Sequence, residues 1–294
     1  MNKVRGFEGA TVQGARGQGL VRGLTLALLL VLGVVPAIAQ NPPAPVVADD
    51  PDKDPNLSQP DFTIVNLPTT LRLPKFSSAF RVTHRFGRPL GAGDIGDLAG
   101  DLFGLDSGGQ IGLEYRFGLA SGLQVGIIRT SNKTIEFFGQ YNVVQQGDGA
   151  PIGLDVVARY AGTNNFRNIY TPALGVVVSR ELGRSGAVYV EPIWVHNANP
   201  LDLPGDDNDS LLIGIGTRLR IRPTVYLVGE FAPRVGYDTP THYASFGIEK
   251  RAGGHLFQVN FSNGLSSTIG DITKFGGTGY EDWYLGFNIS RKFF

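Results

Sequence analysis

Apolar and polar residues alternate along the stretch 209–233. Between positions 211 and 221 the apolar residues fall on one face of an extended chain, with only Leu212 out of phase, and the other face carries glycines, Arg218 and Arg220. Because successive side chains of a strand point to opposite sides, the pattern predicts a strand with one apolar and one polar face. Its length of about ten residues suits a tilted strand that crosses a bilayer. A soluble β-sandwich has strands of the same pattern, so this stretch alone leaves both folds open.

The alternation recurs along the chain and predicts twelve strands. An even number of strands lets an antiparallel barrel close with both termini on one side. We therefore expect an all-β fold, a single up-and-down antiparallel transmembrane β-barrel of about twelve strands, with both termini periplasmic. The predicted strands begin near Phe80, Gln110, Leu123, Thr134, Ile152, Pro172, Ala187, Ser210, Val225, His242, His255 and Asp282.

The connections between these strands sort by length. If the first connection lies outside the cell, the outer loops are 88–109, 131–133, 162–171, 197–209, 232–241 and 262–281. The inner turns are then 118–122, 144–151, 182–186, 222–224 and 251–254. Apart from 131–133, long outer loops alternate with short inner turns, which is typical of outer-membrane barrels and has no reason to occur in a soluble meander.

The register of the hairpins can be predicted, because paired residues must share a face. A three-residue turn at 222–224 places Glu230 opposite Gly216 and diagonal to Arg218, within reach of an ion pair. The other pairs predicted on this basis are Ile221 with Val225, Arg220 with Tyr226, Ile248 with Phe257, Phe246 with Val259, and Tyr115 with Val125.

Charged residues gather on the predicted inner face, and aromatic residues mark strand ends on the outer face. The lumen-lining candidates are Glu114, Arg116, Glu136, Asp155, Arg159, Glu191, Arg218, Arg220, Glu230 and Glu249. The candidates for aromatic girdles at the two membrane interfaces are Phe117, Tyr160, Trp194, Phe231 and Trp283. The alternative for the second set is that aromatic residues favour strands in general.

The N-terminus has the pattern of a secretory signal peptide over residues 1–39, with a basic region, a short apolar core and a small-residue site ending at Ala39. Residues 40–60 are rich in proline and aspartate and are expected to form a flexible leader. Residues 61–79 are predicted to be a short extended segment leading into the barrel, because Pro68 disfavours a central strand. The barrel is then expected over residues 80–294, in a bacterial outer membrane.

Composition narrows the classes of function. Lys plus Arg and Asp plus Glu both number 26, so no net charge points to a nucleic acid or an acidic substrate. The chain has no cysteine, which excludes a disulfide framework and thiolate metal sites. We expect a lipid bilayer and the outer-membrane assembly machinery as partners, the latter because the chain ends in Phe293 and Phe294, and we expect no cofactor.

The order of several motifs resembles that of a known family. The motifs are HRFG at 84–87, DLFGLD at 101–106, GLEYRFG at 112–118, LQVG at 123–126 and Gln-Tyr at 140–141. Together they resemble an uncharacterised bacterial family described as a membrane-bound β-barrel domain of unknown function, from about residue 67 to the C-terminus. The resemblance implies a fold and a membrane location, and it supplies no reaction, substrate or binding residues.

Little in the chain points to chemistry. Residues 91–96 fit G-x-G-x-x-G but lack the strand–helix context that a dinucleotide site requires. Asp202, Asp206, Asp207 and Asp209 are weak candidates for calcium ligands. A lipolytic enzyme would need His196 to meet a serine such as Ser210 or Ser245, and no motif marks an activated nucleophile, so we expect no enzyme.

The sequence therefore leads to a function hypothesis with alternatives. The first is a passive pore or transporter of small polar solutes, because a barrel of twelve strands is wider than the filled eight-stranded type. We expect its constriction where Arg218 and Arg220 face Glu230 and Glu191. The second is a non-conducting barrel whose long outer loops bind a surface ligand or partner, and a lipolytic enzyme is a minor third.

Overall fold

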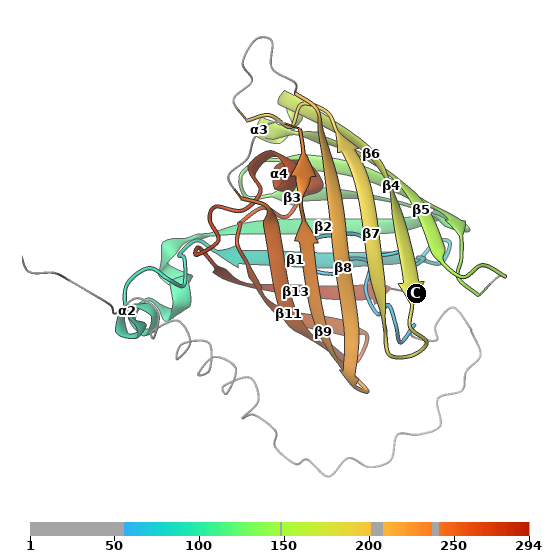
Figure 1. Cartoon of the computed structure of the whole chain (residues 1–294), viewed down its shortest axis with the longest axis horizontal. Helices are drawn as coiled ribbons and strands as arrows, with labels where there is room; N and C mark the ends of the chain where they lie inside the picture. The colour runs from blue at the N-terminus through green and yellow to red at the C-terminus, as the bar shows by residue number, and fades with distance from the viewer. Residues whose placement is uncertain (1–55, 148, 201–207, 237–240, 294) are drawn as a thin grey trace, which may run out of the picture.

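Thirteen strands form one antiparallel sheet that closes on itself in the computed structural model, which describes residues 56–147, 149–200, 208–236 and 241–293 (Figure 1). Apart from the short β10, each strand pairs with its neighbours along the chain, and the first strand pairs with the last. The strands are β1 (Ser78–Phe86), β2 (Gly109–Ala120), β3 (Leu123–Thr130), β4 (Ile135–Val144), β5 (Gly153–Gly162), β6 (Asn168–Glu181), β7 (Gly186–Val195), β8 (Ser210–Arg222), β9 (Val225–Ala232), β10 (Arg234–Val235), β11 (Tyr243–Ala252), β12 (His255–Ser262) and β13 (Tyr284–Phe293).

The predicted up-and-down barrel is confirmed. The two-residue β10 follows β9 after Pro233 and pairs with β8 as β9 does, so twelve strands surround the lumen. Each predicted strand has an observed counterpart that starts within four residues of the expected position. The predicted signal peptide and most of the predicted leader lie outside the described residues.

Outward-facing residues form an apolar band around the barrel, as lipid contact requires. Exposed side chains recur at every second position, among them Leu113, Tyr115, Ile127, Phe137, Leu174, Val190, Ile215, Leu227, Phe257 and Val259. The residues between them are mostly buried inside the barrel. Among the described residues, no helix is long and apolar enough to cross a membrane.

The hairpin registers agree with the predicted faces but not always with the predicted partners. Gly216 pairs with Glu230 as expected, whereas Arg222 rather than Ile221 meets Val225, because a bulge follows Arg220. In two other hairpins the true pairs are Ile248–Val259, Phe246–Phe261, Lys250–Phe257, Tyr115–Ile127 and Phe117–Val125, two residues away from prediction.

The cause of the β11–β12 error is the turn. Gly253 and Gly254 have φ angles of +54° and +79° and form a two-residue turn instead of the expected four-residue one. Left-handed backbone at both central positions matches the twist of a hairpin, and glycine adopts it without strain. A register error of two leaves every side chain on its predicted face, so the inside and the outside of the barrel are unaffected.

Short helices lie in the long connections, at the end of the barrel opposite residues 56 and 293, where the described chain begins and ends. The first loop holds α2 (Ile95–Gly100) and the 3-10 segment η2 (Leu102–Ser107), and the third holds α3 (Thr163–Phe166). The last loop holds α4 (Ile269–Phe275), which folds inward, so that Ile269 and Ile272 are buried. We call this the loop end, and the opposite end, with its short connections, the turn end.

Residues 58–73 occupy the lumen, and we call this segment the plug (Figure 1). All of its residues are buried except Arg72, which is half-buried. The plug turns back on itself at residues 64–67, where the Ile64 N–H donates to the Leu67 carbonyl at 2.8 Å and Thr63 bridges Pro68. Pro68 lacks an N–H and cannot continue a ladder, so the segment forms a tight turn and not a further barrel strand.

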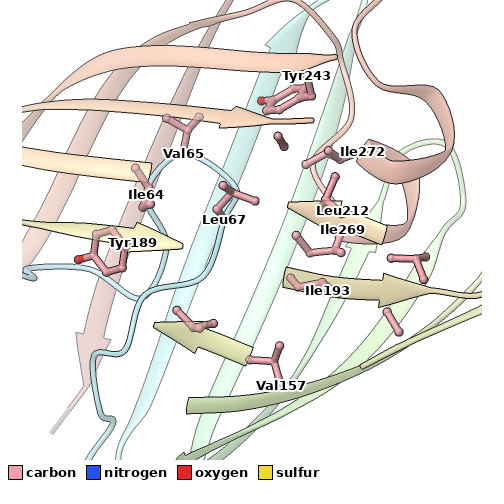
Figure 2. Packing of buried hydrophobic residues seen from close by; sticks show 14 of the residues in the cluster. Ile64, Val65, Leu67, Val157, Tyr189, Ile193, Leu212, Tyr243, Ile269 and Ile272 are labelled. Atoms are coloured by element: carbon pink, nitrogen blue, oxygen red, sulfur yellow. The ribbon is translucent and has the colours of Figure 1, made fainter. Parts of the chain in front are cut away.

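The apolar core sits inside the barrel and joins three parts of the chain. Figure 2 shows the plug residues Ile64, Val65 and Leu67 among side chains of the barrel wall and of α4. The wall contributes inward-facing apolar residues, including Val157, Val177, Ile193, Val195 and Leu212. Leu212, the residue that is out of phase with the apolar face of β8, is fully buried in this cluster. Burial of these side chains, at roughly 25 cal/mol per Å² of apolar surface, holds the plug and α4 in the lumen.

Candidate functional site: the plugged lumen

The tip of the plug is bound by one carboxylate of the barrel wall. Glu230 of β9 accepts hydrogen bonds from the backbone N–H groups of Val65, Asn66 and Leu67, each at 3.0 Å. The Glu230 side chain is buried, so these charge-assisted bonds replace the water that an ionised carboxylate would otherwise need.

A glycine opposite Glu230 leaves room for the tip. Gly216 of β8 pairs with Glu230, and a Cβ added to Gly216 would collide with the Cδ1 atom of Ile64. A side chain at position 216 would therefore have to displace the end of the Ile64 side chain. The neighbouring inward glycine, Gly214, lies against Leu67 in the same way, with a Cβ position 3.0 Å from the leucine side chain.

The carbonyl groups of the plug accept hydrogen bonds from side chains of six strands. The donors and acceptors are Arg81 to Val65, Gln124 to Leu71 at 3.1 Å, Gln140 to Thr69 at 2.6 Å, Arg218 to Thr63 at 2.7 Å, Gln258 to Ile64 at 2.7 Å and Asn288 to Val65 at 3.1 Å. Buried backbone groups in native structures are nearly always hydrogen-bonded, and here side chains of the wall supply the partners. The plug is thus tied to the wall by side chains from all around the barrel.

The predicted ion pair of Arg218 with Glu230 is wrong. Arg218 instead forms a bidentate pair with Glu249 of β11, with Nε and Nη2 each 2.8 Å from a carboxylate oxygen, and both side chains are fully buried. The long arginine reaches across β9, while Glu230 is occupied by the plug. The prediction considered only cross-strand neighbours. It therefore included neither a contact of Arg218 with the second strand along nor the binding of Glu230 to the plug.

The other lumen-lining candidates are buried, with Arg220 as the exception. Arg159 pairs with Glu136 at 2.5 Å and Arg116 with Glu114 at 2.9 Å, whereas Asp155 accepts from Gln140 at 2.6 Å and Asn142 at 2.7 Å. Both carboxylate oxygens of Glu191 are buried without a hydrogen-bond partner among the described residues.

The expected constriction is not assembled. Arg220 is half-exposed near the turn end, where it donates to the carbonyls of Pro223 and Arg184 at 3.3 and 3.4 Å. Arg218, the other predicted cation, is bound to Glu249 and to the plug. The plug, and not a ring of charges, fills the lumen at this level.

The loop end of the lumen is covered by α4. Thr268 caps the helix by accepting from the Asp271 N–H at 3.2 Å, and the Asp271 carboxylate accepts from Asn132 at 3.4 Å. Burial raises the pKa of Asp271 above its usual range, against the opposing effect of hydrogen bonds from Asn132, Thr268 and Thr134. Figure 1 places α4 within the outline of the barrel, above the plug.

A cavity of about 1210 Å³ opens at the turn end, below the plug, and we call it the vestibule. The walls of the vestibule include the lower plug residues and the turns at 121–122, 145–146, 224 and 253–254. The described chain begins here, because Asn56 lines the vestibule. The barrel is therefore hollow at the turn end and filled above it.

Three of the aromatic girdle candidates are well exposed on the outer surface. Tyr160, Trp194 and Phe231 are 41–43% exposed, and Phe117 and Trp283 are half-buried. Tyr160 stacks on Tyr170 with ring centroids 5.7 Å apart. These positions suit interfacial side chains, and their depth in a membrane stays a prediction.

The residues considered for catalysis do not meet. The exposed His196 lies 2.5 Å from Asp209, which also accepts from the Trp194 indole at 3.2 Å. Ser210 pairs with Val195 and points inward, to the face opposite His196, and Ser245 is likewise buried. Because adjacent residues of a strand alternate in direction, these serines and His196 lie on different sides of the wall.

No metal site is found among the described residues. Of the weak calcium candidates, Asp209 is engaged by His196 and Trp194. Asp202, Asp206 and Asp207 lie outside the described residues. The glycine-rich stretch 91–96 leads into α2, where Asp94 caps the helix, and no strand–helix–strand unit surrounds it.

A comparison with protein families decides the assignment. The model of a family described as a membrane-bound β-barrel domain (DUF5777) matches residues 61–293. The chain belongs to this family. The matched region includes most of the plug as well as the whole barrel, so the family domain contains both. The resemblance seen in the sequence motifs is thereby confirmed.

Solved structures with a similar course of the chain include porins and another outer membrane protein. NanC porin has 8% identity and a TM-score of 0.49, and Omp33 of Acinetobacter baumannii has 10% and 0.45; each match covers 74% of this chain and 99% of the other. A triple mutant of the Rhodopseudomonas blastica porin has 12% identity and a TM-score of 0.32, covering 63% and 55%. Likenesses this distant carry no information on the solute. A search of the curated proteins finds no match to this sequence.

The residues that bind the plug were only partly visible in the sequence. Glu230 and Arg218 were candidates because they are charged and face inward. Gln124, Gln140, Gln258 and Asn288 were missed, although they lie on the same inner face. The sequence contains a feature that could have predicted the plug. Inward amides and inward apolar residues such as Ile193 and Leu212 alternate with the lipid-facing positions, and apolar side chains such as leucine are not expected on the wall of an aqueous pore.

Proposed function

We propose that the protein is an outer-membrane channel for small polar solutes that its own plug holds closed. In this proposal a cleaved signal peptide directs the chain across the inner membrane, and the assembly machinery inserts the barrel with both termini in the periplasm. The apolar outer band supports contact with a bilayer, and Phe293, 46% exposed on β13, supports recognition of the last strand by that machinery.

The observation that carries the proposal is the plug in the lumen. It is held by side chains of the wall, and its hydrogen bonds leave the backbone ladder of the barrel complete. A plug bound in this way can withdraw through the turn end without breaking any strand pairing. The wall behind it is rich in charged and amide groups, which suit the passage of polar solutes once the tip has left.

The closure at the loop end follows the plug in this mechanism. Ile269 and Ile272 of α4 belong to the same buried cluster as Leu67 of the plug (Figure 2). When Leu67 leaves, the apolar side of α4 loses part of its contact surface, which weakens its docking by the free energy of that burial. One movement at the plug therefore favours opening at both ends.

Conductance in planar bilayers tests the proposal. The full chain is expected to be closed for most of the time, and a variant that lacks residues 58–73 is expected to conduct ions steadily. Heat-modifiable migration in gel electrophoresis confirms that each preparation is a folded barrel. A synthetic peptide of residues 58–73, added from the turn end, should close the deleted channel, whereas a scrambled peptide should not. A folded deletion variant without conductance would contradict the channel.

A second function is favoured by the first outer loop. In Figure 1 the loop with α2 and η2 projects from the barrel, and its Ile95 and Leu102 are 50% and 59% exposed. Apolar side chains at the tip of a projecting loop suit a binding surface. A non-conducting barrel that holds this loop for a surface ligand or partner predicts that neither the full chain nor the deletion variant conducts.

A further inference from the structure

The vestibule carries a positive charge that no acidic residue around it balances. Four lysine and arginine side chains line it: Arg72, Lys75, Arg251 and Lys292. Glu181 is the one carboxylate of the described lining. The lining therefore has a net charge of +3, in a cavity of about 1210 Å³ with low-dielectric walls that concentrate the potential.

These cations have no carboxylate partner within the described part of the chain. Arg72 donates to the neutral side chains of Gln145 and Ser121. The Lys292 ammonium lies over the ring of Phe62, 5.1 Å from its centroid. Asp61 attracts Lys292 electrostatically, but its carboxylate accepts a hydrogen bond from the Ser290 hydroxyl, at 2.9 Å.

The remaining two cations, Lys75 and Arg251, likewise have no carboxylate partner among the described residues. Lys75 lies over the ring of Phe76, 4.6 Å from its centroid. The Nη1 atom of Arg251 is buried and has no hydrogen-bond partner among the described residues. A buried donor without a partner costs free energy, so a further group with acceptor atoms is expected at this point.

Glu181 does not neutralise these cations, because the start of the described chain uses it. The carboxylate accepts from the side chains of Asn56 at 3.3 Å, Ser58 at 2.5 Å and Gln59 at 2.6 Å. These bonds fix the point at which the chain enters the lumen. They place Asn56, the first described residue, at the wall of the vestibule.

The sequence immediately before Asn56 has the complementary charge. Residues 49–54, Asp-Asp-Pro-Asp-Lys-Asp, have a net charge of −3. Asp49 lies seven positions before Asn56, which is a reach of at most about 24 Å in an extended chain. A tether this short gives an effective concentration on the order of millimolar, so weak ion pairs are sufficient for occupancy.

We propose that the vestibule is the docking site of the acidic stretch 49–54 of the same chain. The carboxylates bind the four unpaired cations, and this contact holds the lower end of the plug in place. Salt weakens the contact, because exposed ion pairs are screened at about 1 M salt, where the Debye length is roughly 3 Å. The docking does not require that the barrel conducts, so it can be tested independently of the channel proposal.

Cross-linking tests the docking directly, because the chain has no native cysteine. The variant K53C/T224C joins the acidic stretch to the vestibule wall and should form a disulfide rapidly in the folded barrel. The pair K53C/S131C, with Ser131 at the loop end, is the control for nonspecific oxidation and should not cross-link. Replacement of Asp49, Asp50, Asp52 and Asp54 by Asn should slow the K53C/T224C reaction by roughly tenfold, the summed effect of several weak pairs.

Matched controls separate charge from conformation. Replacement of the same aspartates by Glu keeps the charge and should preserve the reaction rate. The pair of substitutions R251Q and K292Q should slow the reaction as the Asn set does. Equal rates for the Asn and Glu sets would overturn the proposal. Millimolar pyrophosphate gives a second test. If it slowed the cross-linking of the Asn set as much as that of the parent, the vestibule would be a site for free anions, and the proposal would again be overturned.

Discussion

Both carboxylate oxygens of Glu230 lie 3.0 Å from the backbone nitrogen of Asn66, which precedes it by 164 residues in the chain. The contact joins the centre of the barrel wall to the tip of the plug. It needs no particular side chain at position 66, since the donor is the backbone. Its strength comes from the charge and the burial of the carboxylate.

Glu230→Ala is expected to release the plug. Three backbone N–H groups would lose a charged acceptor in a buried site, which costs about 2–4 kcal/mol of plug binding. The rate of thiol modification of a T63C reporter in the plug should rise by at least an order of magnitude, as that free energy implies. Glu230→Gln retains one acceptor oxygen and should give an intermediate rate. Equal rates in all three proteins would mean that Glu230 does not hold the tip.

Gly216→Val should also displace the plug, by a different route. The new side chain would occupy the position of Ile64, and overpacking of this kind costs about 1–3 kcal/mol. Open-channel probability in planar bilayers should increase, while heat-modifiable migration stays normal. The double variant G216V/I64A restores the space and should close the channel again. Failure of the second substitution to restore closure would show that the effect arises within the barrel wall.

Arg218→Met is expected to destabilise the whole barrel rather than alter its ion selectivity. The substitution leaves Glu249 buried and without its cation, a loss of about 3–5 kcal/mol in unfolding free energy. The double variant R218M/E249L removes both charges and should recover most of the stability. Urea unfolding followed by tryptophan fluorescence measures the difference. A single variant as stable as the parent would show that the pair is not desolvated.

Asp271 should make the docking of α4 depend on pH. Its pKa is raised in the folded state, so the folded protein binds the proton more tightly than the unfolded chain. The penalty for ionising the buried carboxylate is absent at pH values below its unfolded pKa of about 3.9 and grows as the pH rises through the raised value. The unfolding temperature of the parent relative to D271N should therefore fall between acidic and neutral pH. A constant difference across that window would contradict the shift.

The period-two pattern in the sequence was sufficient for the barrel. Each strand position has only two possible directions, so alternation in Leu211, Ile213 and Ile215 places their side chains toward lipid wherever the strand pairs. The pairings Ile248–Phe257 and Tyr115–Val125 were wrong by two residues, yet the faces were right, because a shift of two preserves them. Strand number and loop order were determined locally for the same reason.

The plug was decided only by the tertiary structure. Residues 58–73 have no periodicity that marks their partners, and those partners lie up to 229 residues away, as in the bond from Ser290 to Asp61. Glu230 binds backbone N–H groups, which every residue but proline has, so the sequence carries no trace of that contact. Arg218 pairs with Glu249, although Glu230 lies on the adjacent strand, and the carboxylate of Glu230 binds the plug. A strand pattern specifies which side a residue faces, and only the folded lumen shows what meets it there.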